Sequence, residues 1–302
     1  MPEGDTIFQT AAALRPLLVG QPILAARARA PGPAIERVVG TRVTSVEPVG
    51  KHLLIRFDNG LALHTHLRMG GTWHRYAPGE RWKMPAWRAR VVLELAEHVV
   101  VCFNAPVAEL MEDRAVGLHP ALVSLGPDLI RDDFDAAEAF RRLRARPDVE
   151  VAEALLDQRI MAGIGNVFKC EVLFLESVNP WTLVGAISDN KLNALIATAH
   201  RLLQQNAAPA RARRVTTNRD PRSSAGTPGS GPGRGQPNVV QEAPPGPGRA
   251  ATVFGRAAGA PGSVWVYGRA NRPCARCGAP IRVRRQGRLN RPTYWCPGCQ
   301  PA

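Results

Sequence analysis

The stretches Cys274-Ala275-Arg276-Cys277 and Cys296-Pro297-Gly298-Cys299 are two Cys-x-x-Cys pairs with eighteen residues between them. Four thiolates at this spacing make a tetrahedral set that suits zinc and leaves no position open for a substrate. Two disulfides or four unrelated cysteines are the alternatives. The repeated spacing and the lack of a secretory signal favour metal over either of them. We therefore expect one structural zinc ion per chain, held by Cys274, Cys277, Cys296 and Cys299.

The residues between the two pairs predict a β-hairpin. Residues 281–285 and 291–295 have strand character, and Gly287 and Asn290 mark a turn between them. The segment carries five arginines, so a bound metal would close a small, rigid, arginine-rich ribbon at its base. Such a ribbon indicates the phosphate backbone of a nucleic acid as its partner.

The positive charge of the chain is concentrated in its last third. Residues 201–302 contain 17 arginines and 2 acidic residues, whereas residues 1–200 contain 22 basic and 23 acidic residues. This distribution indicates a polyanionic partner for the C-terminal third, with a merely soluble basic tail as the alternative.

Length and composition favour a folded protein of the cytoplasm. A chain of 302 residues suits two domains with room for an appended module, and 45% hydrophobic residues suffice for real cores. No apolar run is long enough to cross a membrane, and no signal peptide begins the chain. Cys102 and Cys170 stand alone in apolar surroundings, which fits a reducing compartment.

The N-terminus predicts an amphipathic helix that starts almost at the first residue and ends before Gly20. Its apolar positions have helical spacing and are Ile7, Ala11, Leu14 and Leu18. A helix this early fixes the N-terminus in place, which is unusual unless the terminus has a function.

The next part of the chain predicts paired strands. Residues 51–57 and 61–67 flank the turn Asp58-Asn59-Gly60, which is a strong hairpin signal. Residues 90–95 and 99–103 have the pattern of a second hairpin. Several such pairs predict an antiparallel sandwich or barrel.

His64 and His66 alternate along one of these strands and raise the question of a metal site. Alternate histidines on a strand are more often simply packed or half exposed. We therefore expect packed or half-exposed histidines here, with a metal role as the alternative.

Residues 135–205 have helical character. Residues 151–158 and 167–175 predict two helices that flank a turn containing Gly163 and Gly165. Backbone N–H groups at the start of the second helix would then be free to hold a phosphate, with an ordinary tight turn as the alternative.

Residues 206–262 are rich in Pro, Gly, Ala, Arg and Ser and contain almost no large apolar residues. This composition predicts a largely disordered linker or surface loop. Strand character returns at residues 264–269, which lead into the ribbon.

Several short motifs occur in order along the chain: Met1-Pro2-Glu3-Gly4, Gly50-Lys51-His52-Leu53-Leu54, His66-Leu67-Arg68-Met69, Gly163-Ile164-Gly165-Asn166-Val167 with Glu171-Val172-Leu173-Phe174, and residues 291–300. With these motifs the sequence resembles the formamidopyrimidine-DNA glycosylase/endonuclease VIII family of DNA repair enzymes. The resemblance covers nearly the whole chain except about residues 206–262, and that many ordered matches are very specific.

The chemistry of the N-terminus agrees with this resemblance. Methionine before proline is readily excised, which would leave Pro2 with a secondary amine whose pKa is about 8 and which is partly unprotonated at neutral pH. Its attack on a sugar C1′ gives an iminium that stays cationic and favours elimination of the 3′ and then the 5′ phosphate. Glu3 can deliver protons to the ring oxygen or the departing base. The plain alternative is that Pro2 and Glu3 only begin a helix.

The resemblance implies roles for further residues. Lys51 matches a lysine of the family and would hold a phosphate or assist protonation. Asn166 and Arg291 would grip the phosphates that flank a flipped nucleotide. Met69 would fill the gap left in the base stack, with an ordinary core methionine as the alternative.

The sequence also departs from the family pattern. Asp5-Thr6 stands where the family often has Pro-Glu. The supporting catalytic role of the glutamate missing at position 6 is therefore either taken by Asp5 or lost. The other two gap-filling residues cannot be placed within residues 112–117. Residues 206–262 lie near the position of the lesion-covering loop of purine-selective members. Residues 291–296 look more like the endonuclease VIII branch, whose usual substrates are oxidised pyrimidines.

The sequence thus predicts an α+β protein. We expect an N-terminal antiparallel β-sandwich with a leading helix over residues 1–125, a helix–two-turn–helix domain over 130–205, a linker over 206–262 and a four-cysteine zinc ribbon over 263–302.

The expected function is that of a bifunctional DNA glycosylase and abasic-site lyase of base excision repair. It would excise oxidised pyrimidines through a Pro2 Schiff base and cleave the strand by β,δ-elimination. An oxidised-purine glycosylase of the same family and a non-catalytic DNA-binding protein are the alternatives. The expected partner is damaged DNA with abasic sites or oxidised bases, bound by a monomer in the cytoplasm at the nucleoid.

Overall fold

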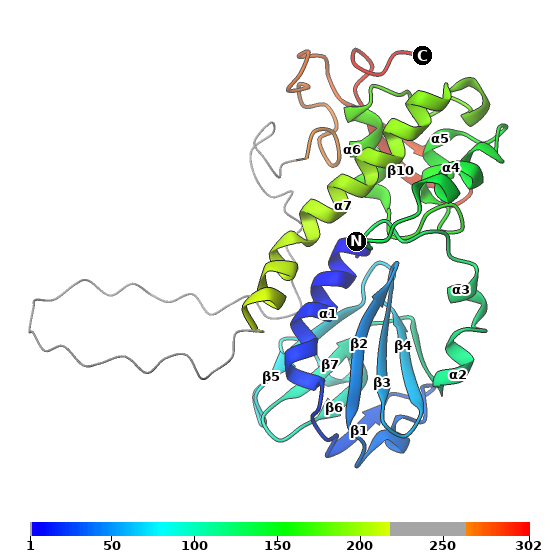
Figure 1. The fold of residues 1–302 in the computed structure, drawn as a ribbon. Helices are drawn as coiled ribbons and strands as arrows, with labels where there is room; N and C mark the ends of the chain where they lie inside the picture. The colour runs from blue at the N-terminus through cyan, green and yellow to red at the C-terminus, as the bar shows by residue number, and fades with distance from the viewer. Residues whose placement is uncertain (1, 218–263) are drawn as a thin grey trace, which may run out of the picture.

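The computed structural model describes residues 2–217 and 264–302. One half of the molecule is a β-sandwich, and the other is a group of helices that carries a C-terminal two-stranded ribbon (Figure 1). The expected α+β architecture is therefore confirmed. Among the residues described, no helix combines the length and the apolar character that a bilayer crossing needs.

Helix α1 (Gly4–Leu18) forms because its apolar residues share one face, as the spacing predicted. These residues are all fully buried: Ile7, Ala11, Leu14 and Leu18. On another side α1 runs beside helix α7 (Asp189–Thr217), where the Gln9 side chain donates a 2.7 Å hydrogen bond to the Asn206 carbonyl (Figure 1). Helix α1 therefore joins the sandwich to the helical half.

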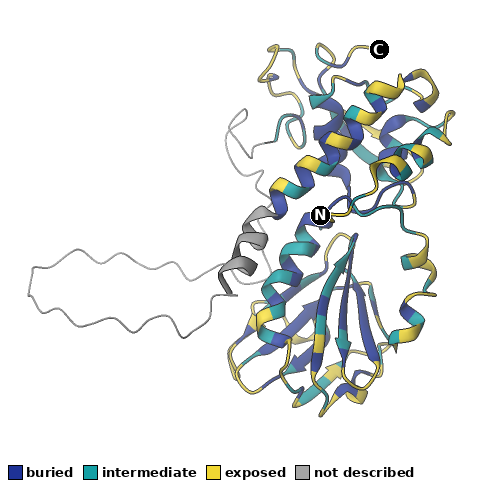
Figure 2. Ribbon diagram, viewed as in Figure 1, coloured by how far each residue is buried: buried dark blue, intermediate teal, exposed yellow. Residues whose placement is uncertain are grey.

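Two four-stranded antiparallel sheets make the sandwich, with strand orders β1-β6-β7-β5 and β2-β3-β4-β8. The strands are β1 (Ala25–Ala28), β2 (Val43–Val49), β3 (His52–Phe57), β4 (Leu61–His66), β5 (Thr72–Tyr76), β6 (Ala89–Glu94), β7 (Val99–Phe103) and β8 (Val107–Glu112). Both predicted hairpins occur, β3 with β4 and β6 with β7. The inner faces of the sheets share one buried core with α1 (Figure 2).

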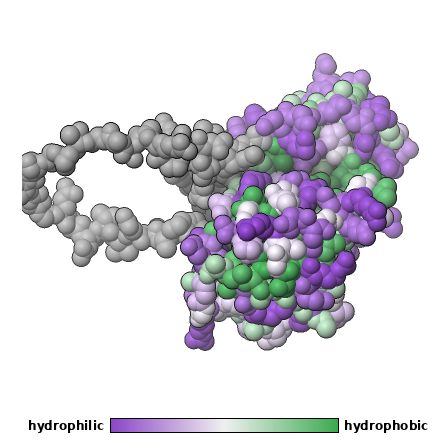
Figure 3. Space-filling model, turned by 60° about the horizontal axis from the view of Figure 1, so that its bottom comes forward, coloured by the Kyte–Doolittle hydropathy of each residue, from purple (hydrophilic) through white to green (hydrophobic). Residues whose placement is uncertain are grey.

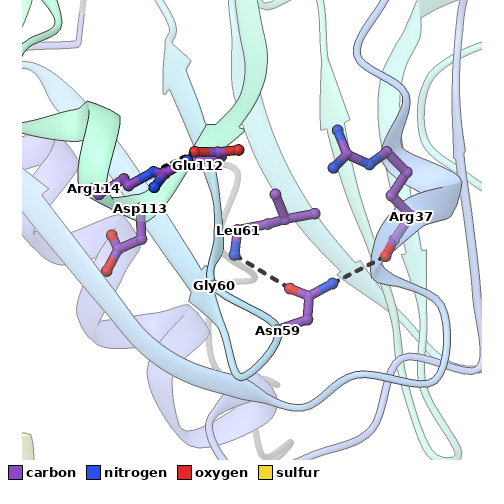
Figure 4. A pocket seen from close by; sticks show the side chains of 7 residues that line it. All are labelled: Arg37, Asn59, Gly60, Leu61, Glu112, Asp113 and Arg114. Atoms are coloured by element: carbon purple, nitrogen blue, oxygen red, sulfur yellow. Dashed lines mark hydrogen bonds and ion pairs between the residues drawn. The ribbon is translucent and has the colours of Figure 1, made fainter.

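The turn between β3 and β4 confirms the signal at Asp58-Asn59-Gly60. The Asn59 side chain accepts a 3.2 Å hydrogen bond from the Leu61 N–H and donates one of 3.1 Å to the Arg37 carbonyl (Figure 4). Gly60 has a φ of +76°, which glycine adopts at no steric cost. These residues line a polar pocket at the end of the sheet away from Lys51, which precedes β3.

Short helical turns connect the larger elements. They are η1 (Ile35–Val38), η2 (Ala86–Arg88), α2 (Asp113–Val116), α3 (Pro120–Val123) and η3 (Val184–Ala186). Helices α2 and α3 lead from the last strand of the sandwich towards the helical half. Figure 3 views the sandwich end and shows hydrophilic residues over most of that face, around smaller hydrophobic areas.

Helices α4 (Ala136–Arg144), α5 (Val151–Leu156), α6 (Asn166–Leu175) and α7 enclose a second core. Leu143, Leu155, Phe168 and Leu195 are fully buried in it. The two helices predicted around Gly163 and Gly165 are α5 and α6.

Helix α7 extends beyond its predicted end at residue 205. It continues to Thr217, so the first twelve residues of the expected 206–262 linker are helical. Asn206 and Ala207 are buried, and α7 continues past Pro209 into residues 210–214, which are all alanine or arginine and favour a helix. Burial against α1 thus overrides the compositional signal for a linker. Residues 218–262 of that linker lie outside the described residues.

The C-terminal ribbon consists of β9 (Arg282–Gln286) and β10 (Arg291–Trp295), which pair antiparallel as predicted. Gly287 and Asn290 have φ values of +70° and +50° and form the turn. The predicted strand at 264–269 is wrong, because residues 264–269 form bends and a turn. Their backbone N–H groups have another partner, described below.

Candidate active site

The Glu3 carboxylate sits at the N-terminus of helix α6, although Glu3 belongs to the other end of the chain. It is fully buried and accepts hydrogen bonds from the backbone N–H groups of Gly165 and Val167, both at 2.8 Å, and of Phe168 at 3.4 Å. The first N–H groups of a helix have no partner within it and carry partial positive charge. The carboxylate is therefore held by a helix of the opposite half of the molecule.

Glycines make this close approach possible. The Gly4 N–H donates a 2.8 Å hydrogen bond to the carbonyl of Gly163, whose φ is +103°. A Cβ on Gly4 would lie 2.9 Å from the Gly163 Cα, and a Cβ on Gly165 would lie 2.6 Å from both Cγ and Oε1 of Glu3. The Gly-x-Gly turn therefore leaves room for the N-terminal motif.

One expectation and one alternative about these groups are wrong. The N–H groups of Gly165, Val167 and Phe168 are not free to hold a phosphate, because the Glu3 carboxylate occupies them. Glu3 precedes α1 as its N-cap, yet its side chain makes no cap hydrogen bond to that helix. The Glu3 carboxylate is stabilised by a helix dipole, but by that of α6 and not by that of the adjacent helix α1.

Burial and charged neighbours shift the pKa values of the ionisable side chains in this site. Burial raises the pKa of Glu3, and the charge of Lys51 and the backbone N–H groups oppose that rise. Burial lowers the pKa of Lys51 to about 8, with Glu3 opposing the decrease and Arg291 adding to it. Lys51 therefore loses its proton at a lower pH than an ordinary lysine does.

Asp5 and Pro2 lie on either side of Glu3 in the sequence. Burial and the charge of Glu3 raise the pKa of Asp5 to about 7. Asp5 Oδ1 accepts a 2.7 Å hydrogen bond from the Thr6 N–H, and Oδ2 is buried with no hydrogen-bond partner in the part of the chain that the structure describes. Pro2 is half-buried. The supporting role expected for Asp5 stays a prediction.

Asn166 is buried and joins α6 to β10. Its side-chain N–H donates to the Pro292 carbonyl at 2.7 Å, and its Oδ1 accepts from Lys169 Nζ at 2.8 Å. Lys169 Nζ also donates to Thr293 Oγ1 at 2.7 Å, and burial lowers the pKa of this lysine. Lys169 is not among the predicted site residues, although a lysine within the apolar stretch 167–175 is an unusual feature of the sequence.

Arg291 and Met69 meet across the two halves of the molecule. An Nη of Arg291 lies 3.1 Å from the Met69 sulfur. Met69 is 60% exposed and follows Arg68, a non-glycine residue with a φ of +46°. Met69 is therefore no core methionine, and its role as a wedge stays a prediction. The charges of Glu3 and Arg291 both act on Lys51, so the structure brings these three predicted site residues near one another.

Glu171 is a second buried carboxylate that binds backbone N–H groups, a role that was not predicted from the sequence. It accepts hydrogen bonds from the N–H groups of Trp265, Val266 and Tyr267 at 2.7, 3.1 and 2.9 Å. These bonds explain why residues 264–269 form no strand. Glu171 thereby attaches the start of the ribbon to α6.

The four predicted metal ligands converge at the base of the ribbon. The sulfurs of Cys274 and Cys299 are 3.9 Å apart and those of Cys277 and Cys296 are 3.4 Å apart, with all four within 4.8 Å of one another. Tetrahedral thiolates at a Zn–S distance of about 2.3 Å are ~3.8 Å apart. The residues present therefore fit a four-thiolate metal site.

Comparison with known proteins agrees with this geometry. Family models match residues 1–107 as a formamidopyrimidine-DNA glycosylase N-terminal domain and residues 125–216 as a formamidopyrimidine-DNA glycosylase H2TH domain. The chain is 39% identical to the probable endonuclease 8 2 of Streptomyces coelicolor, over 99% of this chain and 94% of that one. It is 36% identical to the DNA-(apurinic or apyrimidinic site) lyase Nei2 of Mycolicibacterium smegmatis, over the full length of both.

A solved structure shares the fold. The Lactococcus lactis Fpg in complex with abasic-site DNA superimposes with a TM-score of 0.75 at 19% identity, covering 99% of this chain and 100% of that one. Family models and full-length relatives thus point to one group of proteins, and the chain belongs to the formamidopyrimidine-DNA glycosylase/endonuclease VIII family.

Proposed function

We propose that this protein is a bifunctional DNA glycosylase and abasic-site lyase of base excision repair that excises oxidised pyrimidines. The observation that carries the proposal is the N-terminal motif itself. Pro2 and Glu3 lie at the junction of the two halves, with the Glu3 carboxylate on the N-terminus of α6 and the Lys51 charge acting on it. This arrangement combines a nucleophile, a proton carrier and a cation in one place.

The proposed reaction begins after removal of Met1. The neutral Pro2 amine attacks C1′ of the damaged nucleotide, and the bond from C1′ to the base breaks. The Pro2 nitrogen gives up its proton, and Glu3 carries a proton to the departing base or the ring oxygen. Opening of the sugar leaves an iminium between Pro2 and C1′. Loss of a C2′ proton expels the 3′ phosphate, a second elimination expels the 5′ phosphate, and water releases the sugar remnant from Pro2.

The proposed DNA contacts use the surface around this centre. Arg291 would pair with a phosphate beside the flipped nucleotide, and the exposed Met69 would enter the gap in the base stack. Asn166 would contribute to DNA binding by a contact with a phosphate and by its hydrogen bonds with Pro292 and Lys169, which fix β10 against α6. A structural zinc ion on the four cysteines would fix the ribbon that carries Arg291.

The preference for oxidised pyrimidines rests on the endonuclease 8 names of the relatives and on the sequence of residues 291–296. An oxidised-purine enzyme of the same family is the alternative. On matched duplexes, we expect excision of a ring-saturated pyrimidine to exceed excision of 8-oxoguanine by about tenfold or more, since one favourable pocket contact discriminates by about that factor. Nicking of a preformed abasic site measures the lyase separately. Equal or inverse lesion preference would favour the purine alternative, and no nicking would favour a non-catalytic protein.

Arg291→Ala and Asn166→Ala are expected to weaken binding to abasic DNA for different reasons. Loss of Arg291 removes a cation, so the slope of log affinity against log salt becomes shallower by about 0.9. Loss of Asn166 removes one of the acceptors of buried Lys169 Nζ, so it lowers stability by about 1–3 kcal/mol and leaves the slope nearly unchanged.

Salt titrations of binding and thermal unfolding separate the two effects. Arg37→Ala is the matched control, because Arg37 lies beside the pocket at the far end of the sheet (Figure 4). An unchanged slope in Arg291→Ala would contradict the proposed phosphate contact.

A further inference from the structure

A row of polar side chains crosses the outer face of the sheet β2-β3-β4-β8. His52 on β3 contacts two histidines of β4: its Nδ1 lies 2.8 Å from His64 Nε2, and its ring centroid lies 4.5 Å from that of His66. The row continues through Glu109 on β8, which pairs with His64 in the ladder, to His119 at the start of α3. None of these five residues takes part in the mechanism proposed above.

Three of these side chains converge on one point. His64 Nδ1 lies 3.0 Å and His119 Nε2 lies 3.1 Å from the same oxygen, Oε2 of Glu109. One atom of each residue falls within a group whose members are all within 4.8 Å of one another. The residues come from two strands and a helix N-cap, so their convergence is a product of the tertiary fold.

We propose that His64, Glu109 and His119 form a binding site for a divalent metal ion of the zinc type, separate from the four cysteines. Two imidazole nitrogens and one carboxylate oxygen are a donor set that zinc accepts, with a fourth position left for water. Ligand distances of about 2.0–2.2 Å to a tetrahedral ion place the donor atoms ~3.4 Å apart. The observed 3.0 and 3.1 Å separations need only a slight widening.

The hydrogen bonds of the row suit metal binding. Without metal, the carboxylate has no proton to give, so His64 Nδ1 donates to it and His64 Nε2 accepts from His52. With metal on Nδ1, His64 carries its proton on Nε2 and donates to His52 Nδ1, while the proton of His52 moves to its own Nε2. His52 thus orients the ligand in the way that outer hydrogen bonds orient metal-bound histidines.

The site is open to solvent on one side. The Glu109 side chain is 48% exposed and that of His119 is 21% exposed, whereas that of His64 is 1% exposed. An ion can therefore enter past Glu109 and reach the buried ring. Since His119 lies between α2 and α3, a bound ion would tie this connecting segment to the sheet.

The test counts metal in the full-length chain. After incubation with excess Zn²⁺ and desalting, we expect elemental analysis to find two equivalents, one for the cysteines and one for the proposed site. Glu109→Gln, His119→Ala and their double variant should each lose one equivalent, and Cys277→Ser should lose the other. Glu97→Gln and His98→Ala, at the turn between β6 and β7, are the matched controls and should retain both.

Co²⁺ provides a second readout that is independent of enzymatic activity. The cysteine site gives an intense thiolate-to-cobalt charge-transfer band, whereas an imidazole and carboxylate site gives only weaker visible bands. We expect the weaker bands to disappear in the double variant while the charge-transfer band stays, which also shows that the ribbon is folded. A wild-type chain that keeps a single equivalent of Zn²⁺, or a double variant that keeps two, would overturn the proposal.

Discussion

A chain that retains Met1, or that carries an uncleaved N-terminal extension, is expected to lose both lyase activity and borohydride trapping. In such a chain the Pro2 nitrogen is part of an amide whose lone pair is delocalised, so it cannot attack C1′. The processed chain instead presents a secondary amine with a pKa of about 8. Borohydride reduces the iminium to a stable amine, so the processed chain should accumulate a covalent complex with abasic DNA whose cross-link maps to Pro2.

Pro2→Gly is the matched variant for this experiment. Glycine also offers an α-amine, so part of the activity should remain, but its imine can lose a proton and its charge. Lys51 is the competing nucleophile, because burial lowers the pKa of its amine to about 8 as well. A cross-link at Lys51 in the processed wild-type chain would refute the assignment of Pro2.

Gly165→Ala is expected to reduce base excision by two orders of magnitude or more. The backbone at this position is extended, with φ −128° and ψ −159°, so alanine fits the local conformation. Its Cβ, however, would lie 2.6 Å from Cγ and Oε1 of Glu3 and must displace the carboxylate from the N-terminus of α6. Loss of a positioned proton donor costs about 10²–10⁴-fold in rate.

Separate measurement of the two steps checks this explanation. Excision of a damaged base should fall most, while nicking of a preformed abasic site should survive better, and Glu3→Gln should show the same division. Gly117→Ala is the control, because a Cβ there meets nothing within 4 Å and its φ is −69°. If Gly165→Ala excises a damaged base as fast as the control does, Glu3 does not act from the position seen here.

The elements that the sequence predicted well are those with a local signal. Helix α1 follows from the spacing of four apolar residues, and the turn at Asn59 follows from its own hydrogen bonds. The convergence of the four cysteines follows from their spacing alone. Each of these features needs only a few neighbouring residues to form it.

The features that the sequence did not reveal depend on partners far along the chain. Glu3 binds α6 across more than 160 positions, and Glu171 replaces the expected strand pairing of residues 264–269 across more than 90. Helix α7 passes its predicted end because α1 buries Asn206 and Ala207. Periodicity and composition contain no information on such contacts, so they emerge only from the tertiary structure.

The position of Glu3 limits which halves of related proteins can be combined in one chain. The acid lies in the first residues of one half, and the three N–H groups that hold it lie in the other. An exchange that replaced one half by that of a relative without either feature would keep both folds and still disturb the junction between them. We therefore expect functional chimaeras to need glutamate at position 3 in one half and the Gly163-Ile164-Gly165 turn in the other, whichever parents supply them.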